Sequence, residues 1–178
     1  MTGIDNIEVI GFFNMANLGN ETHNITTTTW LTPPAVIKAL GEFDLDPCAS
    51  LDRPWDTAKQ HFTVEDDGLK QDWYGRVWCN PPYGREMNPF LEKMIKHVDN
   101  GGSGIVLIFA RTETKAFFDY VWDKADAILF LKGRLKFHYP DGSVGESAGS
   151  PSVLIAYGAR EVSALENCKL PGKLVYLK

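Results

Sequence analysis

The chain has 178 residues, of which 44% are hydrophobic and 23% are charged, and it carries a formal net charge of −5. This length and composition are typical of one globular domain with a buried core, and they exclude an intrinsically disordered chain. We expect no membrane association, because no apolar run approaches the roughly 20 residues that a spanning helix requires.

The chain is predicted to begin with a segment that lacks regular structure. Residues 1–25 are polar and rich in Asn and Gly, so we expect a loose leader before a single domain over residues 26–178. Two prolines then favour the first turn of a short helix over residues 35–40, and a glycine ends it.

Two short strands are predicted next, and each runs into a polar loop. Residues 43–46 alternate between apolar and polar side chains, as in a half-buried strand. Residues 76–79 form the second strand, which stops where two consecutive prolines cannot continue a ladder. Between the two strands, residues 51–72 are mixed and polar, and they are predicted to contain no complete element.

The second half of the chain is predicted to hold longer and more apolar elements. Asn88, which is followed by proline, caps a helix whose apolar stripe ends at a pair of glycines. Residues 105–110 form a continuous apolar run, which is typical of a strand buried in a parallel sheet. The other predicted elements are a helix over residues 115–124, strands over residues 128–131 and 153–157, a flexible loop over residues 141–150 and an edge strand over residues 174–177.

The order of these elements predicts the fold class. Strands that alternate with helices indicate an α/β domain with a mostly parallel sheet and helices on both faces. Ligands of such sheets bind beyond the carboxyl ends of the strands, near the point where the strand order reverses. The loops that follow Asp46 and Cys79 would both lie there, so we expect them to contribute to one site.

The cysteines and histidines show no pattern that is typical of a metal site. Cys48, Cys79 and Cys168 lie far apart without a CxxC pair, and the four histidines have no metal-binding spacing. We therefore expect no metal, and free thiols in a reducing cytoplasm. The first residues also lack the basic and apolar regions of a secretory signal peptide.

The motif that carries chemistry is Asn80-Pro81-Pro82-Tyr83. An exocyclic amino nitrogen of a nucleobase attacks poorly, because its lone pair is delocalised into the ring. The Asn80 side-chain oxygen and the Pro81 carbonyl offer two acceptors for its N–H bonds, and Tyr83 offers a flat face for stacking. The motif therefore favours methylation of a base that has left the helix. The alternative is a loop with an aromatic plug.

Further motifs surround this one in a fixed order. They lie at residues 30–33 (WLTP), 45–50 (LDPCAS), 67–69 (DGL), 72–73 (DW), 80–84 (NPPYG), 110–114 (ARTET), 133–137 (GRLKF) and 150–152 (SPS). This series resembles the phage-type DNA N6-adenine methyltransferases, a compact Dam-like group, over about residues 30–157. The resemblance implies a Rossmann-like class I methyltransferase domain that uses S-adenosylmethionine. It further implies methylation of adenine N6 in double-stranded DNA, with the target base flipped out of the helix. It also implies protection of phage DNA from restriction in the cytoplasm of a bacterial host.

The resemblance assigns roles to individual residues. Asp46 would accept a hydrogen bond from the methionine ammonium of the cofactor, whereas a turn or helix-capping role is the alternative. Cys48 and Ala49 stand where the family pattern has glycines. The assigned cofactor-binding residues are Trp30, Thr32, Pro33, Asp46, Pro47, Cys48, Ala49, Asp67, Gly68, Leu69 and Asn80, with Asp72 as an alternative to Asp67, and the assigned catalytic residues are Asn80, Pro81, Pro82 and Tyr83.

The net charge limits how DNA could be bound. Affinity for phosphates depends on Lys and Arg, which number 18 against 23 Asp and Glu, so any DNA surface must be a local patch. We expect this patch to contain Arg85, Arg111, Arg134 and Lys136. Because Lys132, Arg134, Lys136 and His138 alternate, one strand face is predicted to present them together.

Recognition and the acceptor are less constrained by the sequence. No room remains for a separate recognition domain, so residues 84–89 and 138–150 are the candidate recognition loops, and we expect a short or relaxed target sequence. Cytosine N4, an RNA base or a protein amide could use the same two acceptors, although Asn80 favours adenine over cytosine. A catalytically inactive relative that only binds nucleic acid is a further alternative.

Overall fold

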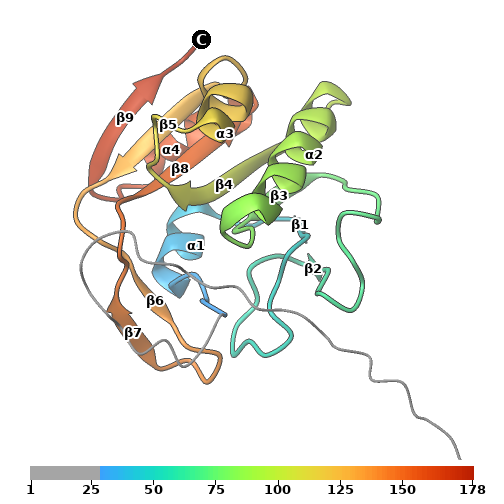
Figure 1. The fold of residues 1–178 in the computed structure, drawn as a ribbon, viewed down its shortest axis with the longest axis vertical. Coiled ribbons are helices and arrows are strands. Elements are labelled where there is room, and N and C mark those ends of the chain that lie inside the picture. Colours follow the sequence, from blue (N-terminus) through green and yellow to red (C-terminus); the bar gives the residue numbers. More distant parts are fainter. Residues whose placement is uncertain (1–28) are drawn as a thin grey trace, which may run out of the picture.

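The computed structural model describes residues 29–178 (Figure 1), so the predicted leader lies outside the described residues and the domain limits remain a prediction. The helices are α1 (Pro34–Leu40), α2 (Met87–Asp99), α3 (Lys115–Phe117) and α4 (Ala159–Asn167), with a 3-10 turn at Gly84–Glu86 and a π-helical turn at Phe118–Trp122. The strands are β1 (Leu45–Asp46), β2 (Gln60–His61), β3 (Arg76–Cys79), β4 (Ser103–Phe109), β5 (Ala127–Leu131), β6 (Lys136–His138), β7 (Val144–Ser147), β8 (Ser152–Tyr157) and β9 (Gly172–Tyr176).

Seven strands form one sheet in the order β2-β1-β3-β4-β8-β5-β9. Strands β1, β2, β3 and β4 are parallel to one another. Strand β8 runs antiparallel to both β4 and β5, and β5 runs antiparallel to β9. The prediction of a mostly parallel sheet is therefore wrong. A strand that is buried on both faces is apolar throughout, whatever its direction, so the run over β8 could not reveal that it is reversed.

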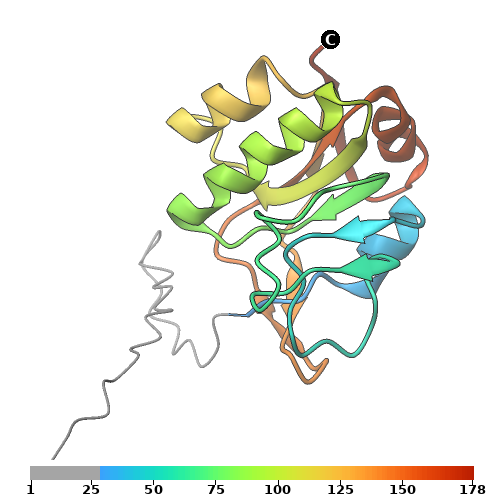
Figure 2. The same ribbon diagram turned by 90° about the vertical axis from the view of Figure 1, so that its right-hand side faces the viewer.

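Helices cover both faces of this sheet, as Figure 2 shows with α2 and α3 on one side and α1 and α4 on the other. Side chains alternate between the faces of a strand, and the core divides accordingly. Val77 and Val106 pack with α2, while Trp78, Ile105 and Leu107 pack on the face that α1 and α4 cover. No helix within residues 29–178 combines the length and apolarity that crossing a membrane would need.

Several predicted elements have different limits in the structure. The 3-10 turn runs directly into α2, so the helix begins at Met87 and Asn88 does not cap it. The predicted helix over residues 115–124 divides into α3 and the π-helical turn. Residues 141–150, predicted as a loop, contain β7, which pairs with β6 in a two-stranded hairpin. Helix α4 was not predicted, because its amphipathic pattern is short.

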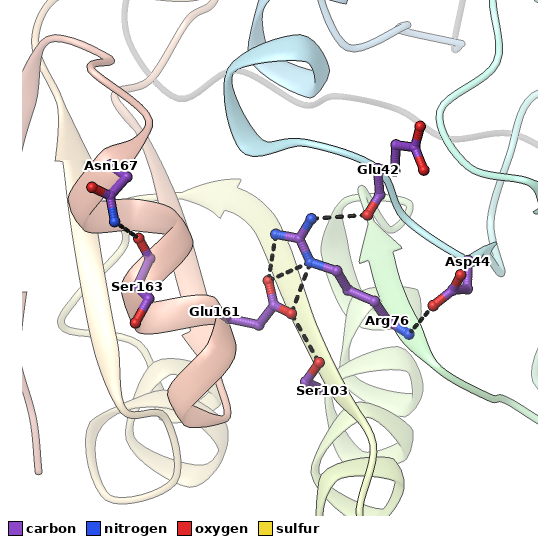
Figure 3. A network of polar contacts seen from close by, with 7 residues as sticks. All are labelled: Glu42, Asp44, Arg76, Ser103, Glu161, Ser163 and Asn167. Carbon is purple, nitrogen blue, oxygen red and sulfur yellow. Dashed lines mark hydrogen bonds and ion pairs between the residues drawn. The ribbon is translucent and has the colours of Figure 1, made fainter.

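A buried ion pair ties α4 to the amino-terminal end of β3 (Figure 3). Arg76 is 4% exposed and Glu161 is 0% exposed, and the guanidinium donates from Nε to both carboxylate oxygens at 2.9 Å. The same guanidinium donates to the Glu42 carbonyl at 2.9 Å and lies 4.1 Å from the ring centre of Phe43. Ser103, at the start of β4, donates to Glu161 at 2.8 Å. The charges at this edge are thus fully paired.

Candidate active site

The structure brings the ends of β1 and β3 to the same edge of the sheet. The two strands are parallel neighbours, with Leu45 opposite Val77, and β2 lies on the other side of β1. After β1 the chain adds β2 on one side and then β3 on the other, so the topological switch point of the parallel strands lies between β1 and β3. Ligands of such sheets bind at this point. The thiols of Cys48, which lies just beyond β1, and Cys79, the last residue of β3, are 3.6 Å apart between their Sγ atoms.

Asp46, the last residue of β1, has a buried carboxylate, and two hydrogen bonds partly compensate it for the loss of water. Its side chain accepts from Thr57 Oγ1 at 2.5 Å and from the Cys48 backbone N–H at 3.1 Å, and the residue is 4% exposed. Burial raises the pKa of Asp46 to about 6, although the hydrogen bonds from Thr57 and Cys48 oppose that rise. A carboxylate in this state has capacity for a cationic ligand. The contact with Thr57 was missed, because residues 51–72 have no periodic pattern.

The loop after Asp46 is closely packed against the predicted adenosine-binding turn. Pro47 is buried, and a Cβ atom at Gly68 would lie 1.9 Å from the Pro47 carbonyl oxygen, so only glycine fits this approach. Ala49 is also buried and donates its backbone N–H to the Phe62 carbonyl at 2.9 Å. The structure therefore places residues 67–69 beside the loop that begins at Asp46.

The side chains of that turn do not all face the loop. Asp67 has a positive φ of 53° and pairs with Lys70 at 2.8 Å, and this contact holds the pKa of Asp67 below its usual value. Leu69 is half-buried and its carbonyl accepts from Lys93 of α2 at 2.7 Å, while Asp72 is exposed. The Asp67 carboxylate is therefore occupied by Lys70, and of this turn it is Gly68 that packs against the loop after Asp46.

Asn80 connects the loop after β3 with residues 30–33 through hydrogen bonds of its side chain. Its Nδ2 donates to the Trp30 carbonyl at 3.4 Å and to Thr32 Oγ1 at 3.3 Å, so residues 30–33 lie against the loop after β3. Its Oδ1 is buried and has no hydrogen-bond partner. With the amide nitrogen occupied, the oxygen is left as a free acceptor in the protein interior.

Pro33 and Trp30 are held by neighbouring elements. The Pro33 carbonyl accepts from Val36 in the first turn of α1 at 2.9 Å. The ring of Trp30 lies 5.2 Å from that of Tyr139, and Leu31 exchanges two backbone hydrogen bonds of 2.9 Å with His138. The β6–β7 hairpin therefore supports residues 30–33 from outside the main sheet.

Tyr83 lies flat against an aromatic residue from the next strand. Its ring stacks on Phe109, the last residue of β4, with centroids 4.3 Å apart and an interplanar angle of 10°. The Tyr83 hydroxyl is buried without a partner, and burial raises its pKa. Pro81 is buried and Pro82 half-buried beneath this turn. Phe109 was not singled out in the sequence, although an aromatic side chain at a strand end is the available signal.

The predicted basic residues are spread around this edge. Arg85 is exposed in the 3-10 turn after Tyr83, Arg111 is half-buried beyond β4, and Arg134 and Lys136 are exposed. Arg134 donates to the carbonyl of Ala148, the residue that follows β7, at 3.0 Å.

The prediction that one strand face presents four basic residues is wrong. Strand β6 covers only Lys136–His138, because Gly133 adopts a φ of +82° and interrupts an extended path. Lys132 and Arg134 therefore precede the strand. The His138 ring contacts the Gly142 carbonyl at 2.9 Å and the Trp55 ring instead of facing outward.

The described part of the chain contains no group of three His, Cys, Asp or Glu side chains that could hold a metal ion.

An α/β sheet with a buried carboxylate at the end of β1 and an Asn-Pro-Pro-Tyr turn after β3 is the arrangement expected of an amino-methyltransferase. Residues 19–163 match the family model described as DNA N-6-adenine-methyltransferase (Dam), so the chain belongs to this family. The family indicates N6 methylation of adenine in DNA as its activity. No curated protein matches the chain.

Proposed function

We propose that this protein transfers a methyl group from S-adenosylmethionine to N6 of an adenine in DNA, at the edge of the sheet where β1 and β3 end. The observation that carries the proposal is the Asn80 side-chain oxygen, which is buried without a partner directly after β3. A buried acceptor without a donor is rare in a folded protein, and it is expected where a ligand supplies that donor.

The loop after β1 fits the methionine end of the cofactor. When bound, S-adenosylmethionine supplies an activated methyl group on a positively charged sulfonium. Asp46 would hold the cofactor's ammonium group, since its carboxylate is buried and, among residues 29–178, has no cationic side chain within hydrogen-bond distance. The turn at Gly68, which packs closely on Pro47, would hold the adenosine part beside this loop, and Trp30, Thr32 and Pro33 would close the methionine end.

The turn after β3 fits the amino group of the target base. Asn80 Oδ1 and the Pro81 carbonyl would accept one N–H bond each, which directs the nitrogen lone pair toward the methyl group. Proline restricts the backbone here, so these acceptors need little reordering when the base binds. Tyr83 would stack on the base with its ring supported from behind by Phe109.

The proposed partner is double-stranded DNA with the target base flipped out of the helix. Arg85, Arg111, Arg134 and Lys136 would form a local phosphate-binding patch in a chain whose net charge is −5. With recognition left to residues 84–89 and the β6–β7 hairpin, we propose a short or relaxed target sequence. A Rossmann-like class I fold, protection of phage DNA from restriction and a cytoplasmic location in a bacterial host complete the proposal.

One experiment tests the reaction directly. The protein is incubated with methyl-labelled S-adenosylmethionine and unmethylated DNA, and the DNA is digested to nucleosides. We expect the label in N6-methyladenine. Label in N4-methylcytosine, in RNA or in protein would show that the acceptor is different, and unlabelled DNA with no cofactor binding by calorimetry would contradict the proposal.

Asn80 provides the test of the site. We expect Asn80→Ala to lower methylation at least about 100-fold, as for other lost transition-state hydrogen bonds, while cofactor affinity stays within a few-fold. Asn80→Asp retains an acceptor and should keep measurable turnover. Asn167→Ala is the matched control, because this asparagine lies on α4 and donates to Ser163. Near-normal turnover of Asn80→Ala would overturn the catalytic assignment.

A further inference from the structure

Ser152, the first residue of β8, has a buried hydroxyl group that no protein atom contacts by a hydrogen bond. The residue is 1% exposed and its Oγ has no partner. Ser103, which begins β4 at the other edge of the sheet, donates to Glu161 at 2.8 Å. A serine at the start of a strand can therefore find a hydrogen-bond partner in this fold. The lack of a partner for the Ser152 hydroxyl is a property of its own surroundings.

The sheet register places Ser152 beside the candidate active site. Ser152 is opposite Phe109, the residue on which Tyr83 stacks. Ser152 lies two residues from Leu154 along β8, whereas Asn80 follows the last residue of β3 and donates to the Trp30 carbonyl. Leu154 belongs to the core cluster against which Trp30 and Phe109 pack, so Ser152 and Asn80 lie on the same side of the sheet.

Asn80 and Ser152 lie on either side of the Tyr83–Phe109 stack. They are two strands apart across the sheet and offset by about two residues along it, which places their Cα atoms roughly 12 Å apart. Strand β4, which ends at Phe109, lies between them, so a base stacked on Tyr83 would have Asn80 on one side and Ser152 on the other. The Asn80 oxygen can only accept, whereas the serine hydroxyl can also donate.

Other unpaired polar atoms surround the same region. Among residues 29–178, five buried side-chain nitrogen or oxygen atoms have no hydrogen-bond partner, namely Trp30 Nε1, Arg53 Nε, Asn80 Oδ1, Tyr83 Oη and Ser152 Oγ. Arg53 lies on the loop after Asp46, and the other four belong to the edge where β3 and β4 end. Buried polar groups are paired in the great majority of proteins, so a cluster of this kind indicates a polar ligand.

We propose that Ser152 contacts the target base by donating a hydrogen bond to a purine ring nitrogen next to the amino group, N1 or N7, while Asn80 accepts from the amino group. This inference rests on the proposed function. It adds a specificity-determining residue from β8, on the side of the site opposite the Asn-Pro-Pro-Tyr turn.

The test combines a protein variant with an altered base. Wild type and Ser152→Ala are assayed under single-turnover conditions on oligonucleotides that carry adenine, 1-deazaadenine or 7-deazaadenine at one target position. We expect Ser152→Ala to lower kcat/KM on adenine by about tenfold. On the analogue that lacks the bonded nitrogen, wild type should already show this loss and the substitution should add nothing. Affinity for S-adenosylmethionine should remain within twofold.

Controls distinguish this contact from a structural role. Ser103→Ala should change kcat/KM equally on all three substrates, because its partner is Glu161. Ser152→Cys, which keeps the side-chain size, provides a second variant if Ser152→Ala folds poorly. Equal losses for Ser152→Ala on all three substrates, or no loss above twofold on any, would overturn the inference while leaving the proposed function intact. Wild type that methylates no adenine would overturn both.

Discussion

The two edges of the sheet, at the amino and carboxyl ends of its parallel strands, treat their polar groups in opposite ways, and two carboxylates, one just before β1 and one at its end, show the contrast. Asp44 precedes β1, accepts from the Arg76 backbone N–H at 2.9 Å and pairs with Lys59 at 3.2 Å. The bond from Arg76, followed by that from Lys59, holds the pKa of Asp44 below its usual value. Asp46, two residues later, is buried with a pKa raised to about 6.

The same difference extends across the sheet. At the Asp44 edge, the charges of Arg76 and Glu161 satisfy one another and Ser103 completes the carboxylate. At the Asp46 edge, Asn80 and Ser152 keep unpaired polar atoms in the interior. Paired groups contribute to folding stability, whereas unpaired groups lower it until a ligand binds. The pairing of buried polar atoms therefore separates the part of the molecule that supports the fold from the part that we propose to bind cofactor and base.

The largest expected effect comes from breaking the paired edge. Glu161→Ala leaves the Arg76 guanidinium buried without its carboxylate, so we expect the free energy of unfolding to fall by about 3–5 kcal/mol. Denaturant unfolding measures this change. Ser163→Ala, on the exposed side of the same helix, should cost less than about 0.5 kcal/mol. A loss below about 1 kcal/mol for Glu161→Ala would mean that the ion pair does not stabilise this edge.

The next prediction compares substitutions of the two aspartates, Asp46 and Asp44. Asp46→Ala should weaken S-adenosylmethionine binding by about 1.5–3 kcal/mol, because a hydrogen bond to a charged group is lost. Asp44→Ala should lower the free energy of unfolding and leave cofactor affinity unchanged. Calorimetry and denaturant unfolding on both variants give the full comparison. A folded Asp46→Ala protein that binds cofactor as tightly as wild type would make Asp46 a structural residue.

The pH dependence of cofactor binding follows from the raised pKa of Asp46. The carboxyl is protonated below about pH 6 in the free protein and must be ionised to hold an ammonium group. Affinity should therefore fall about tenfold per pH unit below 6 and level off above it. Calorimetry from pH 5 to 7 tests this, with Asp46→Asn as the control without that slope. A flat wild-type profile would contradict the assignment.

Stability should respond to the same group in the opposite direction. The folded state favours protonated Asp46, whose pKa is about 6 against an ordinary value of 3.8. Between these two values the unfolded state ionises first, so the contribution of Asp46 to stability becomes less favourable as the pH rises through that window.

The smallest expected effect concerns the basic patch. If Arg85, Arg111, Arg134 and Lys136 all neutralise phosphates, log affinity for DNA should fall against log salt with a slope of about −3 to −4. Arg134→Ala should reduce that magnitude by about one for all sequences alike, while Arg160→Ala, exposed on α4, should leave it unchanged. A change in the methylated sequence would show that Arg134 reads bases, and affinity independent of salt would argue against a DNA substrate.

Local patterns predicted where the main residues of the candidate site lie in the fold, because strand ends and prolines are visible in the sequence. The position of Asn80 followed from two prolines that end β3, and Asp46 followed from the alternation before it. Their meeting at one edge required only that two strands be parallel neighbours, as Leu45 and Val77 are.

The contacts between distant segments could not be predicted in this way. Ser152 reaches the site only because β8 enters the sheet reversed, between β4 and β5, and periodicity carries no information on strand direction. Thr57 reaches Asp46 from a loop without regular structure. Strand β7 formed where Gly and Ser predicted a loop, because backbone pairing with β6, which is itself bridged to Leu31, outweighs local propensity.

The Arg76–Glu161 pair also bears on when the chain can fold. The two residues are 85 positions apart, so a chain still being synthesised contains the guanidinium long before its carboxylate. Contacts of such separation slow folding, and we expect the stable state only after α4 has left the ribosome. Until then the apolar strands β3 and β4 lack the helix that completes their cover, and the yield of protein in a cell depends on how well they are protected from aggregation in that interval.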